Sequence, residues 1–155
     1  MAERQITEDA QWMQEALREA KKAASKNEVP IGAVALYKGQ IIARSHNVRE
    51  ATQDPLGHAE LRLLKTAARK LGHWRMPGLE VAVTLEPCLM CLEAMRQARV
   101  ARIIFGLSDP KAGACGSVWD MRIDPHFRKI AFVGGVGAKE SLNLLRPFFK
   151  KLRCQ

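Results

Sequence analysis

The fold is decided by residues 79–106, which read LEVAVTLEPCLMCLEAMRQARVARIIFG. The apolar and β-branched run 79–85 predicts a buried strand, and residues 102–106 predict a second one. Between them, residues 88–98 predict a helix. Helices that alternate with short buried strands are typical of a sheet covered on both faces. This stretch therefore predicts an α/β fold.

The segments on either side continue this alternation. Thr7 is expected to be the N-cap of the first helix, and Pro147 is expected to kink or break the last one. The predicted architecture is one three-layer α/β/α domain, residues 1–155, with about five strands. The further elements are helices over 7–27, 59–71 and 138 to the C-terminus, hairpin strands over 31–37 and 40–45, a strand over 129–133, and loops over 46–57 and 107–117.

The composition excludes some classes of protein and leaves others open. Apolar residues make up 47% and charged residues 26%, which is ordinary for a globular domain. The longest apolar run, residues 31–37, is too short to cross a bilayer. The N-terminus lacks the apolar core of an export signal, so we expect a cytoplasmic protein.

The basic residues are unevenly placed along the chain. Residues 1–30 hold 5 basic and 6 acidic side chains, so the whole net charge of +9 lies after Pro30. A basic body suits a polyanionic partner such as a nucleic acid. A solvated basic surface explains the same charge, and composition alone does not separate the two.

Two short motifs carry the chemistry: HAE at residues 58–60 and PCLMC at residues 87–91. Each lies at the predicted start of a helix, where residues three apart share one face, so Cys88 and Cys91 can point at a common atom. The positive end of a helix also favours thiolates. Two thiolates and the imidazole of His58 form a ligand set that suits zinc.

The type of zinc site depends on its fourth ligand. A structural site closes with a fourth protein ligand, for which Cys115 is the candidate. A catalytic site leaves that position to water, whose pKa the metal lowers. Glu60 favours the catalytic type, because a carboxylate two residues past His58 can take a proton from that water without binding the metal. The expected chemistry is hydrolytic.

The two motifs match the H-x-E and P-C-x-x-C signature of zinc deaminases, and the likeness extends over nearly the whole chain. The sequence resembles the bacterial tRNA-specific adenosine deaminases. Besides the signature, the stretches that carry the resemblance are VPIGA at 29–33, Asn47, Asp54-Pro55, VTLE at 83–86, Phe105-Gly106 and DPKAGACGS at 109–117. The dipeptide Leu56-Gly57 departs from the expected pattern.

The resemblance implies a fold, a cofactor and a reaction. The fold would be cytidine-deaminase-like with a central mixed sheet, and the protein would be a homodimer with one Zn²⁺ per subunit, held by His58, Cys88 and Cys91. The enzyme would be a hydrolase that converts the wobble adenosine of a tRNA anticodon stem-loop to inosine, with tRNA-Arg as the expected tRNA. Zinc-bound hydroxide would attack C6 of adenine, and Glu60 would shuttle the protons.

The resemblance also implies residues that touch the substrate. Asn47 is expected to contact the flipped nucleoside, and Asp109 either to contact the nucleic acid or to shape the loop before Ser117. At the C-terminal end, the expected RNA contacts are Phe148, Phe149, Lys150 and Lys151.

Two alternatives to this interpretation stay open. The same metal chemistry serves deaminases of a free base or nucleoside, such as guanine or cytidine. A non-catalytic RNA-binding module with a structural zinc is the alternative outside enzymes, and Glu60 argues against it because a structural site has no use for such a carboxylate.

Overall fold

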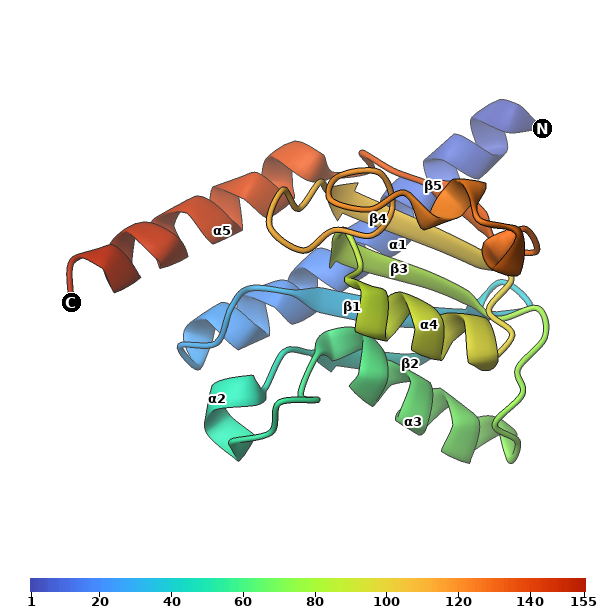
Figure 1. Ribbon diagram of the computed structural model, residues 1–155, viewed down its shortest axis with the longest axis horizontal. Coiled ribbons are helices and arrows are strands. Elements are labelled where there is room, and N and C mark those ends of the chain that lie inside the picture. Colours follow the sequence, from blue (N-terminus) through green and yellow to red (C-terminus); the bar gives the residue numbers. More distant parts are fainter.

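The structure, a computed structural model, describes residues 1–155 and is built on a five-stranded sheet (Figure 1). The strands are β1 (Gly32–Tyr37), β2 (Gln40–His46), β3 (Glu80–Leu85), β4 (Arg102–Leu107) and β5 (Ala131–Val133). Their order is β2-β1-β3-β4-β5. Strand β1 is antiparallel to both neighbours, whereas β3, β4 and β5 run parallel. The predicted mixed sheet of about five strands is confirmed.

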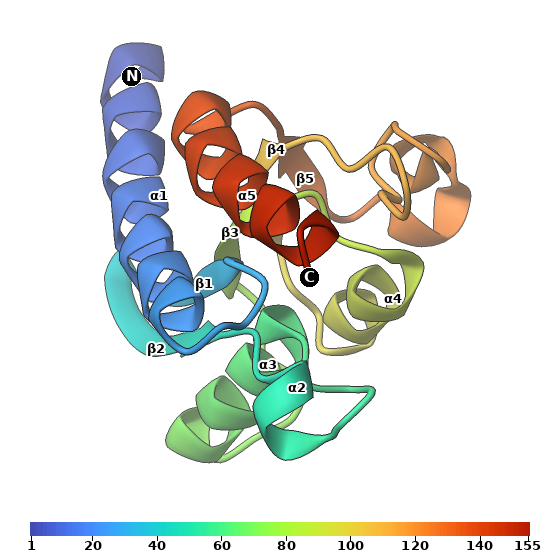
Figure 2. The ribbon, with the colours of Figure 1, turned by 90° about the vertical axis from the view of Figure 1, so that its left-hand side faces the viewer.

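Helices cover both faces of the sheet. One face carries α1 (Ala2–Ser25) and α5 (Ala138–Arg153), and the other carries α3 (Ala59–Leu71) and α4 (Leu89–Gln97), as Figure 2 shows. A four-residue helix, α2 (Arg49–Thr52), and two 3₁₀ turns (Met121–Ile123 and Pro125–Phe127) lie in the connections. The predicted three-layer α/β/α architecture is confirmed.

The core explains why the central strands read as continuous apolar runs. Val34, Ala82 and Ile104 point to one face and pack against Met13 and Leu17 of α1. Their neighbours along each strand point the other way, into a larger cluster beneath α3 and α4. Because successive side chains of a strand alternate between faces, a sheet covered on both sides needs apolar residues at every position.

The first helix begins earlier than predicted. It starts at Ala2, so the expectation that Thr7 is its N-cap is wrong. The Thr7 hydroxyl instead donates to the carbonyl of Glu3 at 2.9 Å, one turn back within the helix. The ion pair of Arg4 with Glu8 also lies in this first part, and such pairs four residues apart stabilise a helix.

Two further expectations need correction. The segment predicted as a loop over 46–57 contains α2. Pro147 does not break the last helix, because α5 continues without interruption from Ala138 to Arg153. The hairpin and the helix over 59–71 are confirmed. No helix of the structure combines the length and hydrophobicity that crossing a membrane requires.

The fold brings the ends of two strands and the starts of two helices together at one edge of the sheet. The carboxyl ends of β3 and β4, at Leu85 and Leu107, and the amino ends of α3 and α4, at His58 and Cys88, border one pocket. Residues 107–117 follow β4 and pass over this edge; we call them the pocket loop. Crevices at the carboxyl ends of strands are a common place for ligand sites in α/β sheets.

Candidate metal centre and substrate pocket

The three predicted metal ligands converge. His58 is the N-cap of α3 and Cys88 the N-cap of α4, and Cys91 follows in the first turn of α4. The Nδ1 atom of His58 lies 3.8 Å from Sγ of Cys88 and 3.4 Å from Sγ of Cys91. All three donor atoms lie within 4.8 Å of one another. The starts of α3 and α4 thus place one nitrogen and two sulfurs around a common point.

This donor set fits zinc. With Zn–S bonds of about 2.3 Å and Zn–N bonds of about 2.0 Å, tetrahedral geometry requires an S···N separation of about 3.5 Å. The two observed separations, 3.8 and 3.4 Å, lie on either side of that value. Cys115 is buried but does not belong to this group of donors. Burial raises the pKa of its thiol to about 12, so it stays protonated. The residues present therefore offer three ligands.

The electrostatics of the group favour charge on one thiol. The hydrogen bond from Cys91, and then that from His58, lower the pKa of Cys88 to about 4. The same hydrogen bond to Cys88 raises the pKa of His58, against the effect of burial. Cys91 has the opposite shift, because its thiol donates to Cys88 and is buried. Metal binding requires thiolates and a neutral imidazole, so a bound cation would displace the protons of His58 and Cys91.

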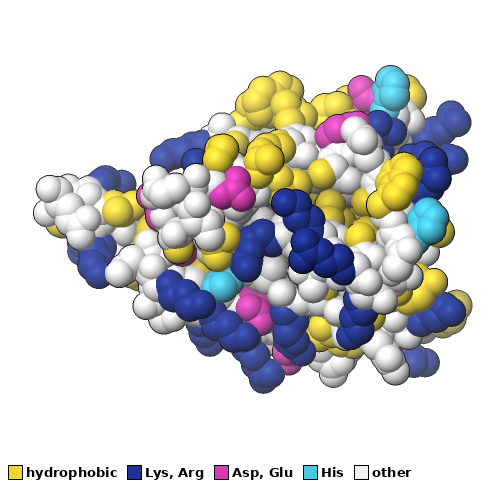
Figure 3. Space-filling model, turned by 90° about the horizontal axis from the view of Figure 1, so that it is seen from below, with side chains coloured by type: hydrophobic (Ala, Val, Ile, Leu, Met, Phe, Trp, Pro, Cys, Tyr) yellow, Lys and Arg dark blue, Asp and Glu magenta, His cyan; other side chains and the backbone are white.

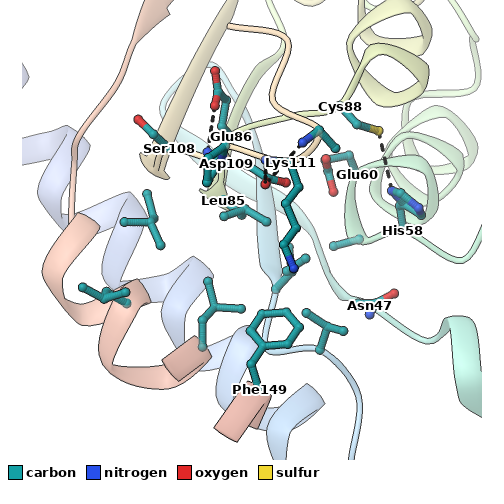
Figure 4. A pocket seen from close by; sticks show the side chains of 18 of the residues that line it. Asn47, His58, Glu60, Leu85, Glu86, Cys88, Ser108, Asp109, Lys111 and Phe149 are labelled. Carbon is teal, nitrogen blue, oxygen red and sulfur yellow. Dashed lines mark hydrogen bonds between the residues drawn. The ribbon is translucent and has the colours of Figure 1, made fainter. Parts of the chain in front are cut away.

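Glu60 lies beside the metal ligands in the first turn of α3. Its side chain is only 5% exposed, yet it lines the pocket. Burial raises the pKa of its carboxyl. Figure 4 shows the carboxyl between Cys88 and His58 on one side and the open pocket on the other. It is thus placed to hold or transfer a proton rather than to bind the metal.

The pocket itself is a cavity of about 490 Å³, within the usual range for small-ligand sites. Its wall is formed by the metal-centre edge, the pocket loop and one face of α5 (Figure 4). Val29, Ile31, Leu85 and Leu107 give it an apolar floor. Apolar walls with a few well-placed polar groups are typical of sites that bind small organic groups.

Asn47 and Asp109 both line this pocket, from different segments. Asn47 is 3% exposed, and its Oδ1 accepts from the backbone amide of Arg49 at 3.3 Å. Oδ1 of Asp109 accepts from the amides of Lys111 and Ala112 at 3.0 and 3.4 Å. The Asp109 side chain therefore shapes the pocket loop, one of the two roles that the sequence left open.

The structure separates the four residues expected to contact RNA at the C-terminal end. Phe149 lines the pocket, and Nζ of Lys111 lies 5.7 Å from the centre of its ring. Phe148 packs edge to face against Phe149, with centroids 5.5 Å apart, but lies outside the pocket. Lys150 and Lys151 are exposed and also do not line it. Successive residues of a helix point about 100° apart, so the residues on either side of Phe149 point away from the surface that it faces.

Sequence reasoning missed three further residues of the α5 face. Leu142, Leu145 and Arg146 also line the pocket. Their positions follow helical spacing, with intervals of three, four and seven residues that include Phe149. A helical projection of residues 138–153 would have shown this face.

The other missed residue is Glu86, which holds the pocket loop in place. The residue is buried, with 3% of its surface exposed. Oε1 accepts from the amides of Cys115 and Ser117 at 2.9 and 3.1 Å, and Oε2 accepts from the amide of Asp109 at 2.8 Å and from the hydroxyl of Ser117. A Cβ atom at Gly113 would lie 1.9 Å from Oε2, so only glycine allows this close approach.

Comparisons with known proteins find deaminases similar to this chain. A family model described as MafB19-like deaminase matches residues 7–153. The tRNA-specific adenosine deaminase of Bacillus subtilis (strain 168) is 44% identical over 149 residues, which cover 96% of this chain and 92% of that protein. The tRNA-specific adenosine deaminase of Aquifex aeolicus (strain VF5) is 40% identical over 142 residues, with 92% and 94% covered.

Solved structures of deaminases share the fold of this chain. One comes from a study of A-to-I editing by tRNA:A34 deaminases at the wobble position of transfer RNA; its TM-score is 0.82 at 38% identity, and the match covers 87% of this chain and 99% of that chain. A guanine deaminase from Nitrosomonas europaea has a TM-score of 0.80 at 19% identity, with 90% and 83% covered. At that identity the likeness shows the fold alone.

Proposed function

The chain belongs to the tRNA-specific adenosine deaminases, and from this premise we propose that it converts adenosine to inosine at the wobble position of a tRNA anticodon. The observation that carries the proposal is that three donor atoms suited to zinc cluster at the edge of one pocket, which His58, Cys88 and the buried Glu60 line. The proposed reaction is hydrolytic: water replaces the exocyclic amine at C6 of adenine, and ammonia leaves.

His58, Cys88 and Cys91 would hold the metal. When bound, zinc supplies a water activated as a nucleophile near neutral pH. The protein's part is to fix three ligands from two helix starts and to leave the remaining direction facing the pocket. Cys115 takes no part in this group, in keeping with a catalytic rather than a closed structural site.

Glu60 is the proposed proton shuttle. Its carboxylate accepts a proton from the water and delivers it to N1 of the adenine ring. In a second step it takes the remaining proton from the oxygen that has added to C6 and passes it to the exocyclic amine, which then leaves as ammonia while the C6–O bond becomes a carbonyl. Burial supports this role, because it raises the pKa of the carboxyl and so brings it nearer to the pH at which a group can both take and give a proton.

Asn47 and Phe149 are the proposed contacts to the nucleoside, because both line the pocket. Asp109 acts by fixing the pocket loop. Phe148, Lys150 and Lys151 lie outside the pocket, and for them we propose contacts to neighbouring parts of the stem-loop.

A homodimer is supported by an exposed apolar surface beside the metal centre. Exposed large side chains lie at the start of α4 and after the pocket loop; they are Leu89, Met90, Val118, Trp119 and Ile123. The two groups are neighbours, because the amides of Val118 and Trp119 donate to Gly113, which pairs with Cys88. Sedimentation should give twice the monomer mass of 17.3 kDa. A stable monomer at micromolar concentration would contradict the dimer.

The experiment that tests the function is inosine formation by the purified, zinc-loaded protein. The substrate is a tRNA-Arg anticodon stem-loop with adenosine at the wobble position, and free adenosine, cytidine and guanine are tested in parallel. Inosine in the stem-loop alone is the expected result. Activity only on a free base or nucleoside would overturn the tRNA assignment. With tRNA as the substrate, we infer a cytoplasmic protein.

Two variants separate an enzyme from a binding module. Glu60→Ala should keep its zinc and lose activity by at least about 10²-fold, the lower end of the usual contribution of acid–base catalysis. Glu93→Ala is the matched control, because this carboxylate lies on α4 and pairs with Arg96 outside the pocket; it should remain active. Equal activity of the two variants would refute the role of Glu60.

A further inference from the structure

Arg62 differs from the other cations of α3, because its side chain bonds back to the protein. Lys and Arg far outnumber Asp and Glu on the face of the molecule that contains α2 and α3 (Figure 3). Of the cations of α3, Lys65, Arg69 and Lys70 are exposed. Arg62 is half-buried instead, and its Nη1 donates to the carbonyl oxygen of His46, the last residue of β2, at 2.7 Å. A charged donor makes this hydrogen bond stronger than one between neutral groups.

The carbonyl that Arg62 binds belongs to the peptide group that leads into Asn47. The N–H of the same peptide group donates to the carbonyl of Ile31 at 3.1 Å. Because a peptide group is planar, the two hydrogen bonds on its opposite edges fix how the chain enters Asn47. That side chain is buried and lines the pocket. A rotation of this one peptide group would turn it.

A second side chain makes the reciprocal contact. Ser45 of β2 is 5% exposed, and its hydroxyl donates to the carbonyl of Ala59, which belongs to the peptide group that leads into Glu60. Beside these contacts, the amide of Val48 donates to the carbonyl of Gly57 at 2.9 Å. The end of β2 and the start of α3 thus each hold the peptide group that precedes a pocket residue of the other segment.

The short helix α2, which follows β2, is held independently. Two amides of its first turn, those of Glu50 and Ala51, donate to the carboxylate of Glu28 at 3.3 and 2.5 Å. Glu28 is 1% exposed and lies between α1 and β1 in the chain, so it ties α2 to that connection. The side chains that join this region to α3 are Arg62 and Ser45.

We propose that Arg62 is a positioning residue, which sets Asn47 relative to Glu60 and thereby sets the nucleoside relative to the carboxyl that moves the protons. The inference deepens the proposed function and rests on it. Arg62 does not line the pocket, so it acts through Asn47 rather than on the reacting atoms. The effect of such a residue is large, because a misplacement of about 1 Å can lower a rate about 10²-fold.

The test compares two arginines of the same helix. Arg62→Ala removes the contact to β2, and Arg69→Ala removes an exposed arginine seven residues further along α3. Arg62→Lys keeps a charged donor of similar length. Arg62→Ala is also made in the Asn47→Ala background, which completes a double-mutant cycle. For each zinc-loaded variant we measure the zinc content, kcat and KM for inosine formation in the stem-loop, and amide hydrogen exchange of residues 46–51.

Arg62→Ala should lower kcat about 10- to 100-fold while its zinc content stays unchanged. Arg62→Lys should recover part of this loss. Arg69→Ala should stay within about twofold of the unmodified protein, as is usual for a surface substitution. In the Asn47→Ala background, Arg62→Ala should lower kcat by less than about threefold, because coupled residues are not additive. Amide exchange of residues 46–51 should accelerate in Arg62→Ala and not in Arg69→Ala.

Two results would overturn the proposal. A rise in KM with unchanged kcat would assign Arg62 to RNA binding instead. The full loss of kcat in the Asn47→Ala background would show that Arg62 acts without Asn47. The proposed function is scored separately by the unmodified protein: inosine formation together with an unaffected Arg62→Ala refutes the positioning role alone, whereas conversion of only a free nucleoside, slowed in Arg62→Ala, refutes only the tRNA assignment.

Discussion

The carboxylate of Glu86 is not one of the candidate metal ligands, but it holds the pocket loop through four hydrogen bonds. Replacing it by alanine leaves three backbone amides and one hydroxyl of the pocket loop without their acceptor. A buried amide without a partner costs about 1–3 kcal/mol. Because the Ser117 and Asp109 groups can reach water, we take the lower value for each amide and expect a loss of about 3 kcal/mol in the free energy of unfolding.

Glutamine at this position should have a smaller and specific effect. Its single oxygen can still accept from Cys115 and Ser117, but its amino group then faces the amide of Asp109, donor against donor. One hydrogen bond is lost, and Glu86→Gln should cost about 1–2 kcal/mol. Glu93→Gln is the control, since Glu93 lies on the surface of α4 with its side chain 42% exposed. Its exposed ion pair should be worth less than about 1 kcal/mol.

Thermal unfolding of the zinc-loaded proteins measures these differences. For a domain of this size, 1 kcal/mol shifts Tm by about 2–4 °C, so Glu86→Ala should unfold about 6–12 °C below the unmodified protein. Amide hydrogen exchange should also accelerate in residues 109–117. If Glu86→Gln unfolds within about 1 °C of the unmodified protein, or if exchange in this loop is unchanged in Glu86→Ala, the reasoning is refuted.

Two other predictions concern the metal and the pH dependence of stability. Cys91→Ser should lose bound zinc while Cys115→Ser keeps one ion per chain, as metal analysis will show; loss of zinc from Cys115→Ser would contradict the open site. Burial, and then the charge of Arg62, lower the pKa of His46, so the unfolded chain binds the proton more readily. Stability from this group is present above about pH 6.5 and is lost as the pH falls below it. Compared with His46→Gln, the protein should lose up to about 1.4 kcal/mol per pH unit between pH 6.5 and 5 in denaturant titrations; parallel curves would contradict it.

Local patterns in the sequence account for the elements and for the metal centre. The helix over residues 59–71 has the predicted bounds, because its apolar spacing lies within the segment and Gly72 follows it directly as the C-cap. The donors Cys88 and Cys91 are three residues apart at a helix start, so their shared direction follows from helix geometry alone. The start of α1 was missed because Thr7 suits an N-cap in isolation, whereas here its hydroxyl bonds within the helix.

The sequence by itself indicated the α/β class, the candidate metal ligands and the carboxylate beside them, because the motifs that carry them, residues 58–60 and 87–91, are each short and each start a helix. Only the tertiary structure decided which strands are neighbours, that Phe149 and not Phe148 faces the pocket, and that Glu86 holds a loop more than twenty residues away. It also decided that Arg49, Lys111 and Arg146 meet at one opening. The physical reason is that such contacts join distant segments, whose approach is set by packing on the two faces of the sheet and leaves no periodic pattern in any one of them.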